Sequence, residues 1–376
     1  MKMGYAMVQH IVKETKRRIS LLQLPYEEEY RAQLKHLGYK EKDIVREVFL
    51  RNEWNVGSAR VLHLLQEESI LTASEYMLSL DSAELTQQIM NDLLETEFTL
   101  LAHIVKYAFQ DNVHSQSLSN VLRESFRSLI ADLKENPNVI PRNYLHAAKA
   151  LLRPAELKMI KSEHLQLLLI ADQDHSNLEE AIGCQQRWRE EMRTADATIL
   201  CGLIVELVHD KAHYIGMLKQ LIDKSSPFSL KYALYMLHVG CTVVQNAEVK
   251  LLKDFIKDLF RTVVDTGLMG KLQLLLLFAR EICASYSAIM GTYSVWYKQM
   301  IGEMRYGVKR DEFIRTMELL TALLPLETDL EMLQVHASIA ISAPAKCNDY
   351  VLNYKQLCRA QIAQLKAPDE TIVLED

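Results

Sequence analysis

Glycine and proline are scarce in this sequence, with 12 and 8 residues among 376. The sequence also lacks runs of alternating β-branched residues separated by hairpin turns, which a sheet would need. Both absences argue against a β-rich fold. Leucine, alanine, glutamate, glutamine and methionine are abundant instead, and they favour helices. Because 49% of the residues are hydrophobic, the chain can bury a substantial core. We therefore expect an all-α fold.

Long hydrophobic runs are also absent. The longest uncharged stretch, residues 232–247, contains His238, Gln245 and Asn246. A membrane-spanning helix needs about 20 consecutive apolar residues, which this stretch does not provide. No secretory signal precedes the basic residues of 13–18. We therefore expect a soluble protein without a membrane partner.

Closely spaced cysteines are missing as well. Six cysteines are spread along the chain without a C-x-x-C pair, at Cys184, Cys201, Cys241, Cys283, Cys347 and Cys358. Most lie in apolar helical stretches, where a reduced cysteine behaves as a small hydrophobe. This usage is typical of a reducing compartment and predicts an intracellular protein, in the cytoplasm or the nucleus. The spacing fits no zinc finger, so we expect no structural metal.

The formal net charge is −6, which does not favour nucleic acid as the partner. Basic clusters at residues 16–18 and 305–310 are short and are explained by solvated helix faces. A nucleic-acid-binding helical scaffold is nevertheless the alternative hypothesis. It requires a basic stripe in three dimensions and binding that weakens steeply with salt.

Common signatures of catalysis are absent too, because the sequence contains no P-loop, dinucleotide-binding or esterase motif. The nearest approach is ELVHDKAHYIGMLK, residues 206–219, where His209 and His213 would share one helix face as zinc ligands do. Asp210 stands where the base glutamate belongs, and Lys219 stands where a third ligand would be. Since an open zinc site generally needs three protein ligands, we predict a non-enzymatic protein without metal or cofactor. A zinc hydrolase using His209 and His213 is the least favoured alternative.

Apolar residues recur at spacings of three and four almost throughout, which predicts helices. Residues 91–109 and 117–133 show the pattern most clearly. Breaks rich in Gly, Pro, Ser and Asn separate helices of roughly 12 to 25 residues. They fall at residues 135–141, 153–154, 172–176, 225–227, 267–270, 306–307, near 325 and at 342–344. The run 267–291 is apolar on more than one face, so it must be covered on two sides.

Helices of this length joined by short turns predict an irregular α-solenoid. It resembles HEAT or armadillo arrays in its helix pairs but lacks a self-similar repeat. A compact α-bundle is the alternative. We expect N-terminal helices in residues 1–70, a helical-repeat scaffold in 71–365 and a flexible acidic tail in 366–376.

Residues 26–65 have a pattern of their own. It predicts three short amphipathic helices, with Gly38 ending the first in a left-handed conformation and Asn55 capping the third. The segments LKHLGY (34–39) and NEWNV (52–56), followed by a helix ending in Leu64-Leu65, resemble the ubiquitin-associated domain family. The resemblance implies a compact three-helix bundle. The alternative is that these helices are simply the first of the scaffold.

The same resemblance implies a ubiquitin-binding surface made of Leu37, Gly38 and Tyr39 in the loop and of Leu64 and Leu65 at the end of the third helix. Leu37 replaces the methionine of the family pattern and Tyr39 its phenylalanine, so the patch is stiffer and has an added hydroxyl. The sequence as a whole predicts a non-enzymatic protein–protein interaction scaffold or adaptor, a subunit of a larger complex. Its expected partners are other proteins, ubiquitin or a ubiquitin-like domain among them.

Overall fold

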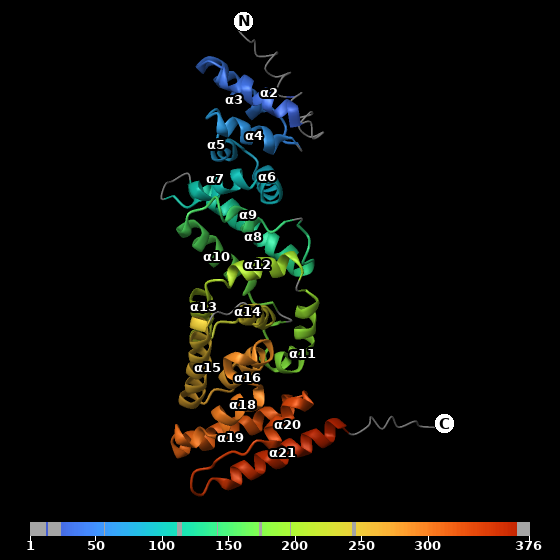
Figure 1. Ribbon diagram of the computed structural model, residues 1–376, viewed down its shortest axis with the longest axis vertical. Helices are drawn as coiled ribbons and strands as arrows, with labels where there is room; N and C mark the ends of the chain where they lie inside the picture. The colour runs from blue at the N-terminus through green and yellow to red at the C-terminus, as the bar shows by residue number, and fades with distance from the viewer. Residues whose placement is uncertain are drawn as a thin grey trace, which may run out of the picture. The chain divides into compact units, whose positions relative to one another are not determined.

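Helices form the structure throughout (Figure 1). The computed structural model describes Lys13 and residues 24–55, 57–110, 115–140, 142–172, 175–195, 197–242 and 246–366. No strand occurs in these ranges, and the predicted all-α class is confirmed. Contacts between residues divide the chain into two units. Unit 1 comprises Met1–Leu167 and Thr198–Leu203, and unit 2 comprises Leu168–Ala197 and Ile204–Asp376.

Unit 1 is built from helices of 5 to 21 residues. They are α2 (Leu24–Lys35), α3 (Tyr39–Arg51), α4 (Ser58–Glu67), α5 (Ala73–Leu78), α6 (Ala83–Thr96), α7 (Phe98–Ala108), α8 (Ser115–Glu135), α9 (Tyr144–Ala148) and α10 (Pro154–Leu168), whose last residue already belongs to unit 2. The predicted helix 117–133 corresponds to α8 and is confirmed. Its apolar positions, among them Leu122 and Phe126, are buried.

The expected single helix 91–109 is wrong, because the chain breaks at Glu97 between α6 and α7. Glu97 has φ −128° and ψ 78°, which is not helical. The break lets α6 and α7 contact each other and lets both pack on α8, while α7 also packs on α5. A straight helix through Glu97 would bury only one stripe of these apolar residues.

Unit 2 contains the remaining helices. They are α11 (Leu178–Thr194), the end of α12 (Ile199–Leu207), α13 (Lys211–Asp223), α14 (Leu230–Thr242), α15 (Asn246–Thr266), α16 (Met269–Ser285), α17 (Ser287–Met290), α18 (Tyr293–Tyr297), α19 (Arg310–Leu323), α20 (Leu330–Ser338) and α21 (Asn348–Lys366). A π-helical turn η2 (Lys298–Gly302) and two 3₁₀ turns, η3 (Met304–Tyr306) and η4 (Leu324–Leu326), connect some of them.

Helix α16 is the centre of unit 2 (Figure 1). Every residue from Lys271 to Cys283 is buried, and α16 contacts α11, α14, α15, α18 and α19. The expectation that this apolar run must be covered on more than one side is confirmed. Each buried leucine contributes about 1.5–3 kcal/mol relative to an exposed one, so α16 anchors the unit.

The break predicted at 267–270 also occurs, between α15 and α16. Gly267 adopts φ +64°, and a Cβ there would lie 2.5 Å from Cδ of Arg315. The positive φ favours glycine at this position, and a side chain there would also displace the Arg315 side chain of α19.

No single helix among the described residues is long and apolar enough to cross a membrane. Helix α16 and the following segment 287–306 reach the length and apolar composition of a membrane span only when taken together. The chain bends by 114° at their junction.

The division between the two units falls inside residues 71–365, which were predicted to form one scaffold. The predicted boundaries at 70 and 365 stay predictions. Helix α21 ends at Lys366. Of the predicted tail, residues 367–376 lie outside the described residues.

Candidate functional site

The loop predicted to bind ubiquitin connects α2 and α3. Helix α2 ends at Lys35 and α3 begins at Tyr39, so Leu37 and Gly38 form the turn. Tyr39 is 82% exposed, next to exposed Gly38 and half-buried Leu37. The left-handed conformation predicted for Gly38 is wrong: the residue is extended, with φ −74° and ψ 166°. Its N–H donates to Oε2 of Glu41 at 2.9 Å and closes the first turn of α3.

The second part of the predicted surface lies inside unit 1. Leu64 and Leu65 are fully buried, because α4 packs against α5, α6 and α7. Within the predicted surface, only Leu37, Gly38 and Tyr39 are therefore accessible to a partner. The prediction that Asn55 caps the third helix is also wrong, because the residue before α4 is Gly57. Asn55 Oδ1 instead accepts a hydrogen bond from the Ser58 hydroxyl at 3.1 Å.

Ion pairs hold α2 against α4 and keep the loop in place. Arg60 Nε donates to Glu27 Oε2 at 2.9 Å, and Arg31 Nε donates to Glu67 Oε2 at 3.1 Å. The hydrogen bond from Arg60 holds the pKa of Glu27 below its ordinary value and outweighs the effect of burial. The helix on one side of the exposed loop, α2, is therefore tied to α4 by two ion pairs.

The two candidate zinc ligands do not share a helix face, so that prediction is wrong. His209 lies in the turn after α12, and His213 lies in the first turn of α13. Asp210 between them is the cap of α13, and its Oδ1 accepts a hydrogen bond from the His213 N–H at 3.1 Å. Helix α12 ends at Leu207, and Asp210 begins α13 as its N-cap, with the non-helical dihedrals φ −86° and ψ 85°. In the part of the chain that the structure describes, no three His, Cys, Asp or Glu residues gather as a metal site.

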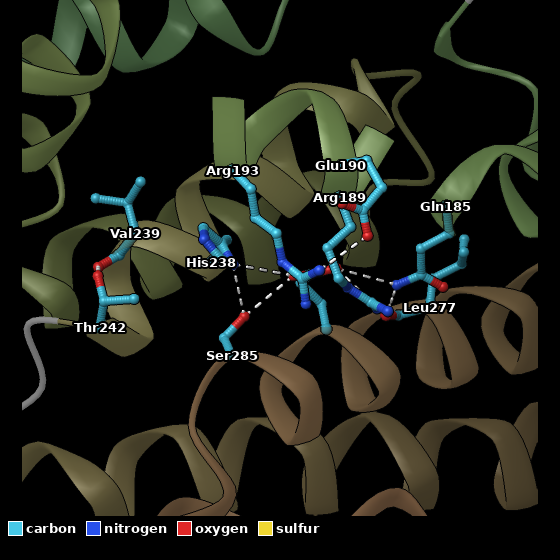
Figure 2. A network of polar contacts seen from close by, with 10 residues as sticks. Gln185, Arg189, Glu190, Arg193, His238, Val239, Thr242, Leu277 and Ser285 are labelled. Carbon is cyan, nitrogen blue, oxygen red and sulfur yellow. Dashed lines mark hydrogen bonds and ion pairs between the residues drawn. The ribbon is translucent and has the colours of Figure 1, made fainter. Parts of the chain in front are cut away.

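A buried polar network lies in unit 2, between α11, α14 and α16 (Figure 2). Its centre is Glu281, which lies near the C-terminal end of α16 and is fully buried. Arg189 Nη2 lies 3.2 Å from Oε2 of Glu281, and Gln185 Nε2 lies 3.4 Å from the same oxygen. Ser285 Oγ donates to Oε1 at 3.0 Å, and His238 Nδ1 lies 3.4 Å from that oxygen.

These partners keep Glu281 ionised inside the core. Burial by itself raises the pKa of this carboxyl, but the hydrogen bond from His238 and the Arg189 guanidinium outweigh burial and lower the pKa. A buried charge is tolerated only when it is paired and hydrogen-bonded in this way.

Serine, histidine and glutamate in one network suggest a hydrolytic triad, but the geometry differs. Both Ser285 Oγ, at 2.9 Å, and Glu281 Oε1, at 3.4 Å, lie against the same nitrogen, Nδ1 of His238. A triad needs the nucleophile and the carboxylate on opposite ring nitrogens. The only hydroxyl proton of Ser285 is given to Glu281, so His238 is not placed to accept it. The arrangement stabilises a helix junction.

A second buried ion pair lies one position earlier on α16. Arg280 pairs with Glu327, and the guanidinium lies 5.6 Å from the ring centre of Tyr293. Although burial disfavours its charge, Glu327 raises the pKa of Arg280 above the ordinary value. The hydroxyl of Tyr293 is within hydrogen-bond distance of His336 Nε2, at 2.9 Å, and burial raises the pKa of Tyr293 to about 12.

A polar cleft of about 350 Å³ adjoins the two ion pairs, entirely within unit 2. Gln185, Arg189 and Arg193 of α11 line one part, together with Arg280 of α16. The segment 328–332 and Tyr293 line another part. The cleft therefore presents guanidinium, carboxamide, hydroxyl and carboxylate groups in one place.

A groove of about 330 Å³ in the same unit is mostly apolar. Leu178, Phe228, Leu230 and Leu274 contribute to its lining, and Leu268, which is half exposed, lies at the start of α16. It differs from the polar cleft in offering few groups that would orient a ligand.

Of the two basic clusters in the sequence, the one at residues 305–310 lies within the described residues. Residues 16–18 lie outside the described residues. At the other cluster, Arg305 stacks over the ring of Tyr306 at 4.6 Å and donates to the Ala343 carbonyl at 3.3 Å. Lys309 and Arg310 nearby are exposed.

Arg280 and Glu281 were not among the residues predicted to form a site. The sequence nevertheless marks these two residues, because they are adjacent charges inside the apolar run LLLLFAREIC. Charged residues that interrupt the buried face of a helix need partners, and such partners are provided by other helices.

The sequence matches one family model, described as Fanconi anaemia group A protein N terminus, over residues 11–368. No curated protein matches the chain.

Proposed function

Because the chain belongs to the family of the Fanconi anaemia group A protein N terminus, we propose that it is a non-enzymatic scaffold subunit of a larger protein complex. The match over residues 11–368 is the observation that carries this proposal. A compartment inside the cell, the cytoplasm or the nucleus, is part of the same proposal.

The arrangement of the helices supports a scaffold. Neighbouring helices in the chain pack on each other within each unit, as α7 on α8, α15 on α16 and α20 on α21. We propose that these pairs form an irregular array of the HEAT or armadillo kind. Such arrays bind other proteins through many modest contacts on a rigid surface.

The experiment is a comparison of sedimentation. The purified chain has a mass of 43.3 kDa, and the same chain, tagged and expressed at a low level, would be sedimented in cell extract. We expect a larger species in the extract that carries other proteins in fixed ratio and survives nuclease treatment. Sedimentation at the same mass in both conditions would contradict the proposal. A large species that nuclease dissolves would favour the nucleic-acid-binding scaffold instead.

A second candidate function is the capture of ubiquitin or a ubiquitin-like domain by the module in residues 26–65. The exposure of Tyr39 beside Leu37 and Gly38 favours it, since a small apolar patch framed by a turn can dock the apolar patch of a partner. The proposal is limited to this loop, because Leu64 and Leu65 are buried.

Labelled ubiquitin would be titrated with the full chain and followed by nuclear magnetic resonance. Tyr39→Ala should abolish the shifts, while Tyr306→Ala, an exposed tyrosine of unit 2, should leave them unchanged. Absence of shifts with the unmodified chain, or equal loss in both variants, would refute this function.

A further inference from the structure

Helix α21 packs on α19, α20 and η4 with one face and exposes the other. On the exposed face, Tyr350, Leu352 and Leu357 are 37%, 59% and 40% exposed. Within residues 350–365, which the structure describes throughout, Arg359 is the only exposed residue with a charge. A helix face that stays in water usually carries several charges, whereas the core of a protein interface is depleted in them. The exposed face of α21 therefore has the composition of an interface.

The exposed residues of α21 from 349 to 360, here called the outer face, form a centre and two flanks. Asn353, Gln356 and Ala360 have helical spacing and run along the centre. Tyr350 and Leu357 are seven positions apart, so they follow one another on one flank. This flank offers an aromatic ring and an aliphatic side chain to a partner.

The opposite flank offers one charge of each sign. Arg359 lies on it, and Asp349 lies between it and the centre. Both side chains are exposed, and neither forms an ion pair within the described part of the chain. A partner that fits this flank must therefore supply an acidic group opposite Arg359 and a basic group opposite Asp349.

A second copy of this chain meets both requirements when the two helices run antiparallel. A twofold axis then places residues equally far before and after it opposite each other, and each flank meets the same flank of the partner. Asp349 and Arg359 are each five positions from Tyr354, so an axis beside Tyr354 places Asp349 opposite the partner's Arg359. Tyr350 and Leu357 lie four positions before and three after Tyr354. The same axis therefore places Tyr350 opposite the partner's Leu357.

The antiparallel arrangement also keeps like charges apart. Ten residues of helix span about 15 Å, so Asp349 lies about that far along the helix from the partner's Asp349, and the same holds for Arg359. A parallel pair would bring like charges together instead. One register thus satisfies the charged flank and the apolar flank at once, which favours a second copy over an unrelated partner.

We propose that the outer face of α21 binds the outer face of a second copy of this chain, antiparallel about an axis beside Tyr354. The interface contains two ion pairs between Asp349 and Arg359 and two contacts between Tyr350 and Leu357. This self-association goes beyond the proposed scaffold function, because it gives the assembly two copies of every other binding surface. One helix face from each copy makes a small interface, so the association is weak.

Sedimentation equilibrium of the purified full chain, from about 1 to 100 μM, tests the self-association. We expect the mass to rise with concentration from 43.3 kDa towards twice that value. A mass that stays at 43.3 kDa over the whole range would overturn the proposal. If such a chain still formed a larger species in cell extract, only this inference would be wrong and the scaffold function would stand.

Two charge reversals test the register. Asp349→Arg brings two arginines together at each ion pair, and Arg359→Asp brings two aspartates together, so each variant alone should associate at least about tenfold more weakly. An equimolar mixture of the two variants should form a mixed dimer, because every pair again joins opposite charges. Recovery on mixing requires both variants to be folded. A mixture that associates no better than the separate variants would refute the register.

The apolar flank is tested by Leu357→Lys, which should also weaken association at least about tenfold, since it puts an unpaired charge into the interface. Leu151→Lys is the matched control, because Leu151 of unit 1 is 37% exposed, close to the 40% of Leu357. Asp254→Arg, at an exposed position of α15, is the control for charge reversal. Both controls should associate as the unmodified chain does. Unchanged association of the Leu357 variant would mean that the copies meet at another surface.

Discussion

At the scale of single residues, unit 2 depends on a few buried charges. Glu281 is held by His238, Arg189, Gln185 and Ser285, which come from three helices. Such a network specifies one arrangement of the helices, because any shift leaves a charge unpaired in a medium of low polarity.

Glu281→Gln keeps the shape of the side chain but leaves Arg189 without its counter-charge. We expect a loss of about 3 kcal/mol in the free energy of unfolding, measured by urea denaturation. Glu190→Gln, which alters the exposed pair with Arg193 in the same region, should cost less than about 1 kcal/mol. Similar losses in the two variants would show that burial of the network is unimportant.

One buried histidine, His164, should make the stability of unit 1 depend on pH. It is fully buried: Nδ1 donates to the Ile160 carbonyl at 2.8 Å, and Nε2 accepts from the Tyr144 hydroxyl. Burial lowers the pKa of His164 from 6.5 to about 4. The unfolded chain therefore takes up this proton first, and stability should fall as the pH drops from 6.5 to about 4, by roughly 3 kcal/mol in total.

Urea midpoints measured across this pH range would check the dependence. In His164→Leu the slope between these pH values should flatten, although the variant is less stable throughout. Replacing the exposed His36 by Gln should leave the slope as it is. A slope that persists in the His164 variant would assign it to other groups.

At the scale of elements, helix ends are satisfied by side chains from other helices. Lys355 of α21 is buried, and its Nζ donates to the carbonyls of His336 at 3.0 Å, Ala337 at 3.1 Å and Ile339. These carbonyls belong to the end of α20, where a helix leaves its last acceptors unpaired. The positive charge also suits the negative end of the helix dipole.

Lys355→Met should therefore loosen α20 in particular. We expect a loss of about 2 kcal/mol in the free energy of unfolding, because carbonyls that accept from a charged donor would lose it. Lys298→Met, at an exposed position of η2, is the control and should change stability little. If both variants are equally stable, Lys355 does not cap α20.

At the scale of the molecule, burial is unevenly distributed within the second unit. Helix α16 is buried without interruption from Lys271 to Cys283, whereas in α21 only Tyr354, Lys355 and Cys358 are buried. Helices with few buried contacts open at lower free energy than helices of the core.

Hydrogen exchange followed by mass spectrometry should show this difference. Amides of α16 are expected to exchange most slowly in unit 2, and those in the second half of α21 much faster. Equal protection of the two helices would mean that burial does not govern opening in this unit.

Much of the fold could be predicted from local patterns. The breaks at 225–227 and 267–270, the helix α8, and the three short helices expected in 26–65, which the structure has between 24 and 67, follow from periodicity and from turn residues. The candidate site could be predicted only in part. Tyr39 is exposed as expected, but Leu64 and Leu65 face the core. An amphipathic pattern shows which face of a helix is apolar, but not whether another helix of the chain or another protein buries that face.

Local propensity and spacing were sufficient to predict the all-α class, the position of most helices and the deep burial of α16, since each depends on residues within one segment. The tertiary structure alone decided that the chain breaks at Glu97, that Asp210 separates His209 from His213, and that Gln185 meets Glu281, 96 positions away. Contacts between distant residues depend on how whole helices pack. Packing selects one of many arrangements that the same local patterns allow.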